Sequence, residues 1–234
     1  MQKKLIKLLV QNTNFSRKQI LQFFKNQEVT IDGQVVNQDF ENFIGTEIKI
    51  QGQEIYSWWT IYLAINKPTG YVCANIDNLH STIFEILEPK YRNIQNLHTV
   101  GRLDKDTTGL LLVTNDGQWT HSLTSPKKHV EKVYLVTVDQ KIDSALISHF
   151  AQGVQIGPNE ITRPGQLEII SSNQAFLTID EGKFHQVKRM FKTFNYQVTN
   201  LKRVQYGKLK LTDLNLKEGQ TLLLSQAQIE QIKK

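Results

Sequence analysis

A charged loop that leads directly into an apolar segment limits most strongly how this chain can fold. Residues 102–106 carry four charges, whereas residues 110–113 are all apolar. Asn115-Asp116-Gly117 then has the composition of a turn. The pattern predicts a buried strand with a charged loop at its entrance. Such a loop is either a solvated turn before a core strand or a group of functional residues held by a rigid element.

The chain has 234 residues, 39% of them hydrophobic, which is enough for one core and a small satellite domain. Cys73 is the single cysteine, so no disulfide can form within the chain and a reducing cytoplasm is expected. Lys7 interrupts the apolar N-terminal stretch, and no small-residue cleavage site follows it. We therefore expect a helix there rather than an export signal. No segment reaches the ~18 uninterrupted apolar residues of a membrane span.

The formal net charge is +6, and its distribution is uneven. Residues 183–210 contain eight basic residues and no acidic one, interleaved with aromatic residues. A solvated face would explain this composition. Basic and aromatic residues together are also typical of a surface that binds nucleic acid, and we favour that interpretation.

Residues 1–50 predict a separate small module. Ser16 and Gln19 have the spacing of a capping box at the start of a basic helix. Asp32-Gly33 predicts the turn of a hairpin that follows the helix. Residues 51–60 are interpreted as a linker that docks through Trp58 and Trp59.

Residues 61–234 predict a second, larger domain. Residues 61–65 form a strand that a turn over residues 66–70 ends, with Lys67 exposed. Residues 132–138 form another strand, in which Tyr134 lies on one face. A helix follows Glu181-Gly182. Its buried stripe is predicted from residues 184, 187, 191 and 194, which are Phe184, Val187, Phe191 and Phe194.

The loop and strand resemble the catalytic motif of pseudouridine synthases. Gly101-Arg102-Leu103-Asp104 and the following Asp106-Thr107-Thr108-Gly109-Leu110-Leu111-Leu112 carry the resemblance. It implies that Asp104 is the catalytic residue. It also implies that Tyr134, in Lys132-Val133-Tyr134, packs against the target base. The segment from Glu181 to Phe191 resembles a second family motif, whose basic position falls on Lys188, with Arg189 as the alternative.

Residues 1–50 are similar to the S4 RNA-binding domain, through the helix start at Ser16-Arg17-Lys18 and the strand before Gly33. From the two resemblances together we expect six residues to bind substrate RNA. They are Arg102, Arg189, His185, Lys67, Arg17 and Lys18. For Arg102, a structural ion pair with Asp104 or Asp106 remains the alternative.

The family's reaction breaks the glycosidic bond of a uridine, turns the base and rejoins it through carbon. It requires an ionised carboxylate, whose charged form a nearby lysine or arginine favours. The base must also be flipped out of its stack, at a cost of ~a few kcal/mol. The sequence does not decide whether the carboxylate attacks the ribose or the base.

We therefore predict an α+β protein: an S4-like domain (1–50), a linker (51–60) and a catalytic domain (61–234) with a mixed, largely antiparallel sheet. The expected function is pseudouridylation of 16S ribosomal RNA. The alternatives are a 23S ribosomal RNA target and a non-catalytic ribosome-assembly role.

No cofactor is expected because the reaction has no redox step or net transfer. No metal is expected because the six histidines lie far apart in the sequence. The protein is expected to be a monomer that acts on ribosomal RNA or a partially assembled small subunit.

Overall fold

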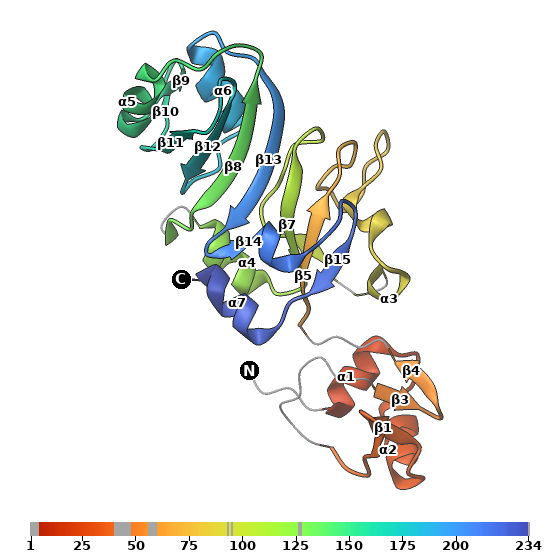
Figure 1. The fold of residues 1–234 in the computed structure, drawn as a ribbon. Helices are drawn as coiled ribbons and strands as arrows, with labels where there is room; N and C mark the ends of the chain where they lie inside the picture. The colour runs from red at the N-terminus through yellow and green to blue at the C-terminus, as the bar shows by residue number, and fades with distance from the viewer. Residues whose placement is uncertain are drawn as a thin grey trace. The chain divides into compact units, whose positions relative to one another are not determined.

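The computed structural model describes residues 5–39, 48–55, 60–92, 94, 96–125 and 128–233. Its chain divides into two compact units (Figure 1). The first comprises Met1–Ile61 and Glu88–Asn96, and the second comprises Tyr62–Leu87 and Leu97–Lys234. The predicted docking through residues 58 and 59 lies outside the described residues. Within the described part of the chain, every helix is too short or too polar to cross a membrane.

The first unit combines helices with a four-stranded antiparallel sheet in the order β2-β1-β3-β4. Its elements are α1 (Leu5–Asn12), α2 (Arg17–Lys25), β1 (Val29–Ile31), β2 (Gln34–Val35), β3 (Ile48–Ile50), β4 (Gln53–Ile55) and α3 (Pro89–Arg92). The capping box of Ser16 and Gln19 is confirmed at the start of α2. The hairpin is confirmed too, because Asp32 and Gly33 both have positive φ, as a tight two-residue turn requires.

The second unit is built on a nine-stranded sheet, in the order β11-β12-β8-β13-β7-β5-β15, with β14 paired to β13 and β6 to β7. Its elements are β5 (Tyr62–Lys67), η1 (Ile83–Ile86), β6 (His98–Thr99), β7 (Thr108–Thr114), α4 (Gly117–Thr124), β8 (Lys132–Val138), α5 (Ala145–Gln152), β9 (Gln155–Gly157), β10 (Glu160–Ile161), β11 (Gln166–Ile169), β12 (Gln174–Ile179), α6 (Gln186–Thr193), β13 (Val198–Tyr206), β14 (Leu209–Lys210), η3 (Leu211–Leu214), β15 (Thr221–Leu223) and α7 (Gln226–Lys233).

The pairing of β13 with β7 is parallel, and the other strand pairs of this sheet are antiparallel. The predicted mixed, largely antiparallel sheet is therefore confirmed. In Figure 1, β8 and β13 run side by side along the length of the unit, and β7 continues the sheet toward β5.

The central strands β7 and β8 differ in how far their side chains are buried. β7 is buried at nearly every position, as expected for a strand that is covered on both faces. β8 alternates between buried and half-buried positions, which confirms the predicted two-residue period. Residues of α4 and α7 join those of β5, β7 and β13 in one apolar cluster. This packing fixes β7, the strand that directly follows the charged loop.

Candidate active site around Asp104

Asp104 lies in a loop that the neighbouring chain holds from several sides. The Thr107 amide donates to the Asp104 carbonyl at 3.1 Å, which closes a tight turn. The Gly70 amide donates to the Lys105 carbonyl at 2.9 Å. On the other side of the turn, the Leu103 amide donates to the Cys73 thiol sulfur at 3.4 Å. The loop is therefore fixed by backbone contacts before any RNA binds, and the Asp104 side chain keeps 31% of its surface exposed.

Lys67 is the centre of this support, and the prediction that it is an exposed turn residue is wrong. It is the last residue of β5 and is fully buried. Its ammonium donates to the carbonyls of Pro68, Lys105 and Thr107 at 3.0, 3.2 and 2.9 Å. Burial lowers the pKa of Lys67, while the charges of Cys73, Asp106 and others oppose that shift. Three carbonyls converge on this position, so the side chain holds the Asp104 loop from beneath rather than pointing at solvent.

A Lys67→Met variant is therefore expected to lower the free energy of unfolding by about 1–3 kcal/mol, because three carbonyls, including that of the buried Thr107, lose their donor. Loss of the buried ammonium offsets part of that cost. Chemical denaturation checks the change. The matched control is Lys105→Met, which removes an exposed lysine from the same loop and should shift stability by no more than ~0.5 kcal/mol. Equal stabilities of the two variants would contradict the proposed support.

The cationic neighbour of Asp104 is Lys188, on α6. Its ammonium lies 3.6 Å from Asp104 Oδ2 and 2.5 Å from Asp106 Oδ1. His185, just before α6, places Nε2 3.4 Å from Asp104 Oδ1. Partial burial raises the pKa of Asp106, but the hydrogen bond and charge of Lys188 outweigh it, so the pKa is lowered. Sequence reasoning did not identify Asp106 as the closer partner of this lysine.

Arg189 was the alternative to Lys188, and the structure places it elsewhere. Its guanidinium donates to the Ile156 carbonyl and pairs with the Glu160 carboxylate, which ties α6 to β9 and β10. A one-residue step along a helix turns a side chain by about 100°, so neighbouring basic residues face different surroundings. Arg189 therefore anchors α6, and the alternative that it is the cationic partner of Asp104 is wrong in this geometry.

The predicted buried stripe of α6 is wrong at its first residue. The helix begins at Gln186, so Phe184 precedes it and is 70% exposed. His185 adopts a left-handed conformation, with φ of 48°. The rings of Phe184 and His185 stack with their centroids 3.8 Å apart. Val187 and Phe191 are buried as predicted. The left-handed turn thus leaves an aromatic ring on the surface close to Asp104.

A cavity of about 610 Å³ lies beside Asp104. Tyr134, which is 8% exposed, lines it from β8, and Arg102 lines it from the loop. Arg102 is exposed, and within the described residues it forms no ion pair with Asp104 or Asp106. The ion-pair alternative for Arg102 is therefore wrong. Arg102 therefore remains an exposed cation that lines the cavity.

Three further basic residues line the cavity, and sequence reasoning did not select them as site residues: Lys132, Lys183 and Arg203. Lys132 begins β8 and is 9% exposed, and Arg203 lies on β13 and is 2% exposed. A sequence signal existed for Lys132, because the two-residue period of β8 places it on the buried face with Tyr134. Arg203 is buried because its strand, β13, is paired with β7 on one side and with β8 on the other.

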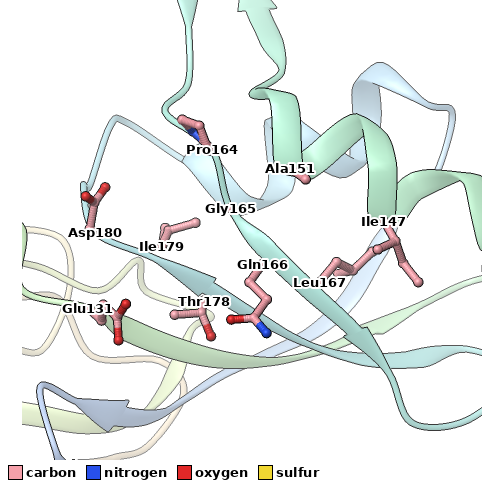
Figure 2. A pocket seen from close by; sticks show the side chains of 10 residues that line it. All are labelled: Glu131, Ile147, Ala151, Pro164, Gly165, Gln166, Leu167, Thr178, Ile179 and Asp180. Atoms are coloured by element: carbon pink, nitrogen blue, oxygen red, sulfur yellow. The ribbon is translucent and has the colours of Figure 1, made fainter.

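A second cavity, of about 450 Å³, is formed by α5, β11 and β12 (Figure 2). Figure 2 shows Ile147 of α5 facing Leu167, with Glu131 and Asp180 at the other side. None of its ten lining residues is basic, and two are acidic. This lining does not suit a phosphate backbone, whereas the cavity beside Asp104 contains several cations.

The structure thus brings together the partly exposed Asp104 carboxylate, the Lys188 ammonium beside it, and a cavity that Asp104 and Tyr134 both line. The family model of RNA pseudouridylate synthase matches residues 61–193, which include this carboxylate and Lys188. The chain belongs to the RNA pseudouridylate synthase family. It is therefore an RNA pseudouridine synthase, and the recognition drawn from residues 101–112 is confirmed.

Full-length relatives agree with this assignment. The chain is 40% identical to the ribosomal small subunit pseudouridine synthase A of Vibrio cholerae over 231 residues, 98% of this chain and 99% of the relative. It is 37% identical over 232 residues to the protein of that name from Escherichia coli, covering 98% and 99%. A crystal structure of a pseudouridylate synthase superposes with a TM-score of 0.69 and 37% identity, covering 98% of this synthase and 99% of that chain.

Proposed function

We propose that this synthase converts one uridine of 16S ribosomal RNA to pseudouridine, with Asp104 as the catalytic carboxylate. The observation that carries the proposal is the position of Asp104 on a braced loop, beside Lys188 and in a cavity lined by Tyr134. The names of the full-length relatives support small-subunit RNA as the substrate.

In this proposal each side chain of the cavity has a distinct role. Lys188 places its positive charge beside the Asp104 carboxylate, which the reaction requires in its ionised form, and His185 lies against the other carboxylate oxygen. Tyr134 packs on the extruded uracil, and Arg102 occupies the space that the flipped base leaves in the RNA. The C1′–N1 bond breaks and a C1′–C5 bond forms. A proton leaves C5 and one is added to N1, so reactant and product are isomers.

We further propose that the first unit is an S4-like RNA-binding domain. Arg17 and Lys18 begin α2, and both side chains are exposed. The capping box at Ser16 fixes the start of the helix, so both cations project from an ordered element. Cations at such positions suit contacts with RNA phosphates.

The double variant Arg17→Ala/Lys18→Ala is expected to weaken RNA binding about 10-fold and to reduce the salt dependence of binding, because two phosphate contacts are lost. The isomerisation rate at saturating RNA should remain unchanged, since the cavity is intact. Binding titrations at several salt concentrations and single-turnover assays check both statements. Lys7→Ala, which removes an exposed cation from α1, is the control. Unchanged affinity in the double variant would argue against this binding surface.

The experiment that tests the proposed function maps pseudouridine in ribosomal RNA from cells with and without the gene, by carbodiimide modification and primer extension. We expect one site to be lost from 16S RNA. A site lost from 23S RNA would show a large-subunit enzyme. Unchanged patterns together with an assembly defect would show a binding role.

A ribosomal substrate would place the enzyme in the cytoplasm, where we propose that it acts as a monomer on 16S RNA or a partly assembled subunit.

A further inference from the structure

Lys132 and Arg203 are two buried cations that line the same cavity as Asp104. In the sheet, Lys132 lies opposite Tyr206, and Arg203 lies opposite Tyr134. Both cations approach the ring of Tyr206. The distances to its centroid are 5.4 Å from Lys132 Nζ and 5.0 Å from Arg203 Cζ. Two positive charges therefore share one aromatic ring in a place with little access to water.

The surrounding protein does not neutralise this pair. Within the described ranges, every carboxylate lies beyond 4 Å from the charged nitrogens of Lys132 and Arg203. Asp180, which lines the same cavity, is instead held by Arg163 Nε and His129 Nδ1, each at 3.1 Å. Arg203 Nε donates to the Leu110 carbonyl at 2.7 Å, whereas its Nη2 is buried without a hydrogen-bond partner.

Two adjacent buried cations without a bound anion destabilise a fold. At Lys132, burial is the main cause and the charge of Arg203 the second cause of a pKa lowered to about 8. The charges of Asp180 and Glu181 oppose this shift. Groups held in such unfavourable surroundings concentrate at functional sites. Asp104 does not account for the pair, since its own cationic neighbour is Lys188.

The reaction produces a negative charge of the kind that Lys132 and Arg203 lack as a partner. When the C1′–N1 bond breaks, the electron pair passes to N1, and the negative charge spreads over the carbonyl oxygens of the pyrimidine ring. We propose that Lys132 and Arg203 bind a carbonyl oxygen of the flipped uracil and stabilise the charge that the base acquires when it leaves C1′. This inference rests on the proposed isomerisation of uridine and assigns the cation pair a step within it.

The step needs no proton transfer by either residue. Lys132 keeps its proton, the base turns, C5 bonds to C1′, C5 loses its proton and N1 gains one. Fixed donors aimed at developing charge act mainly in the transition state. A phosphate group of the RNA is a different occupant for the same cations, but its charge does not change during the reaction. A phosphate site would therefore affect RNA affinity, whereas a leaving-group site affects the rate of bond cleavage.

The test compares wild type and Lys132→Met in single-turnover reactions at saturating 16S RNA that carries either uridine or 5-fluorouridine at the target position. Fluorine withdraws electrons and makes the departing base a better leaving group. In the variant we expect loss of the target uridine to slow about 100-fold or more. Loss of 5-fluorouridine should slow about 10-fold or less, with RNA affinity changed by less than about threefold.

Three controls keep the outcome interpretable. Lys128→Met removes an exposed lysine shortly before β8 and should match wild type on both substrates. Lys132→Arg keeps the charge and should recover most of the rate. The melting temperature of Lys132→Met should equal or exceed that of wild type, since a buried charge is removed.

Equal slowing on both substrates, or weaker RNA binding with an unchanged rate, would overturn the inference. The second result would assign the cations to a phosphate. Failure of the proposed function is a separate result, because wild type would then leave uridine unchanged as well.

Discussion

An Asp104→Asn variant is expected to lose isomerisation by about 10⁴-fold or more at saturating RNA, because the amide carries no charge and is a poor nucleophile and base. The fold should persist. Asp104 contacts His185 and Lys188 at 3.4 and 3.6 Å, and neither contact is a short hydrogen bond. We expect the free energy of unfolding to change by no more than about 1 kcal/mol, as for a partly exposed ion pair. Single-turnover assays and RNA binding titrations measure the two effects separately.

Asp106→Asn is the matched control for that variant. Asp106 lies two residues away, is 69% exposed and contacts the same lysine at 2.5 Å. Its loss frees Lys188 to move closer to Asp104, so we expect a rate within about 10-fold of wild type. If Asp104→Asn retained product formation while Asp106→Asn lost it, the catalytic role would pass to Asp106. Equal and complete loss in both would indicate that the loop acts as a unit.

Gly109→Ala is expected to lower the free energy of unfolding by about 3–5 kcal/mol. Gly109 begins the buried part of β7 with φ of 98°, in the region that costs an alanine about 1–2 kcal/mol. A Cβ atom there would lie 2.2 Å from the Arg203 carbonyl oxygen and 2.9 Å from its amide nitrogen. Both atoms belong to the parallel partner strand β13, so neither can move without breaking the pairing at the centre of the sheet.

Gly117→Ala provides the control for Gly109→Ala. Gly117 begins α4, its φ is not positive, and a Cβ atom would have open space around it. Alanine also favours a helix over glycine by about 1 kcal/mol, so this variant should match or exceed wild type in stability. Chemical denaturation of the two variants measures the difference. If Gly109→Ala were as stable as Gly117→Ala, the close approach of β7 to β13 would not exist in solution.

Asp104 and Gly109 belong to one structural unit, although the two substitutions act by different mechanisms. The strand that the catalytic loop enters is the strand that β13 approaches through Gly109, and Arg203 extends from that same position of β13 into the cavity. Lys67 of the other neighbouring strand holds the loop through its carbonyls. The active-site geometry of the synthase therefore depends on the packing of three adjacent central strands, and stability and catalysis are coupled at this point.

Local patterns predicted much of the secondary structure because short-range physics controls it. The capping box at Ser16, the tight turn at Asp32-Gly33 and the alternating strand over residues 132–138 each depend on contacts between residues close in sequence. The charged loop before the apolar run also identified the family, since the amino-acid sequence of residues 101–112 matches a specific family motif.

Side-chain surroundings required the tertiary structure. The sequence pattern predicts an exposed turn residue at Lys67, yet its ammonium donates to the carbonyl of the adjacent Pro68 and to two carbonyls from the distant Asp104 loop. Lys188 and Arg189 are adjacent and both basic, and only the position of α6 against the loop and β9 assigns one to Asp104 and the other to Glu160.

The sequence alone determined the family, because a local motif is specific to it, and the resemblance to that family implied the mixed sheet and the candidate carboxylate. The tertiary structure alone decided which cations surround the cavity. Lys132 and Arg203 are 71 positions apart, and their proximity arises from the pairing of β8 with β13. Burial and electrostatic interaction depend on distance in space, and a periodic pattern along one strand contains no information about the charge that a distant strand brings beside it.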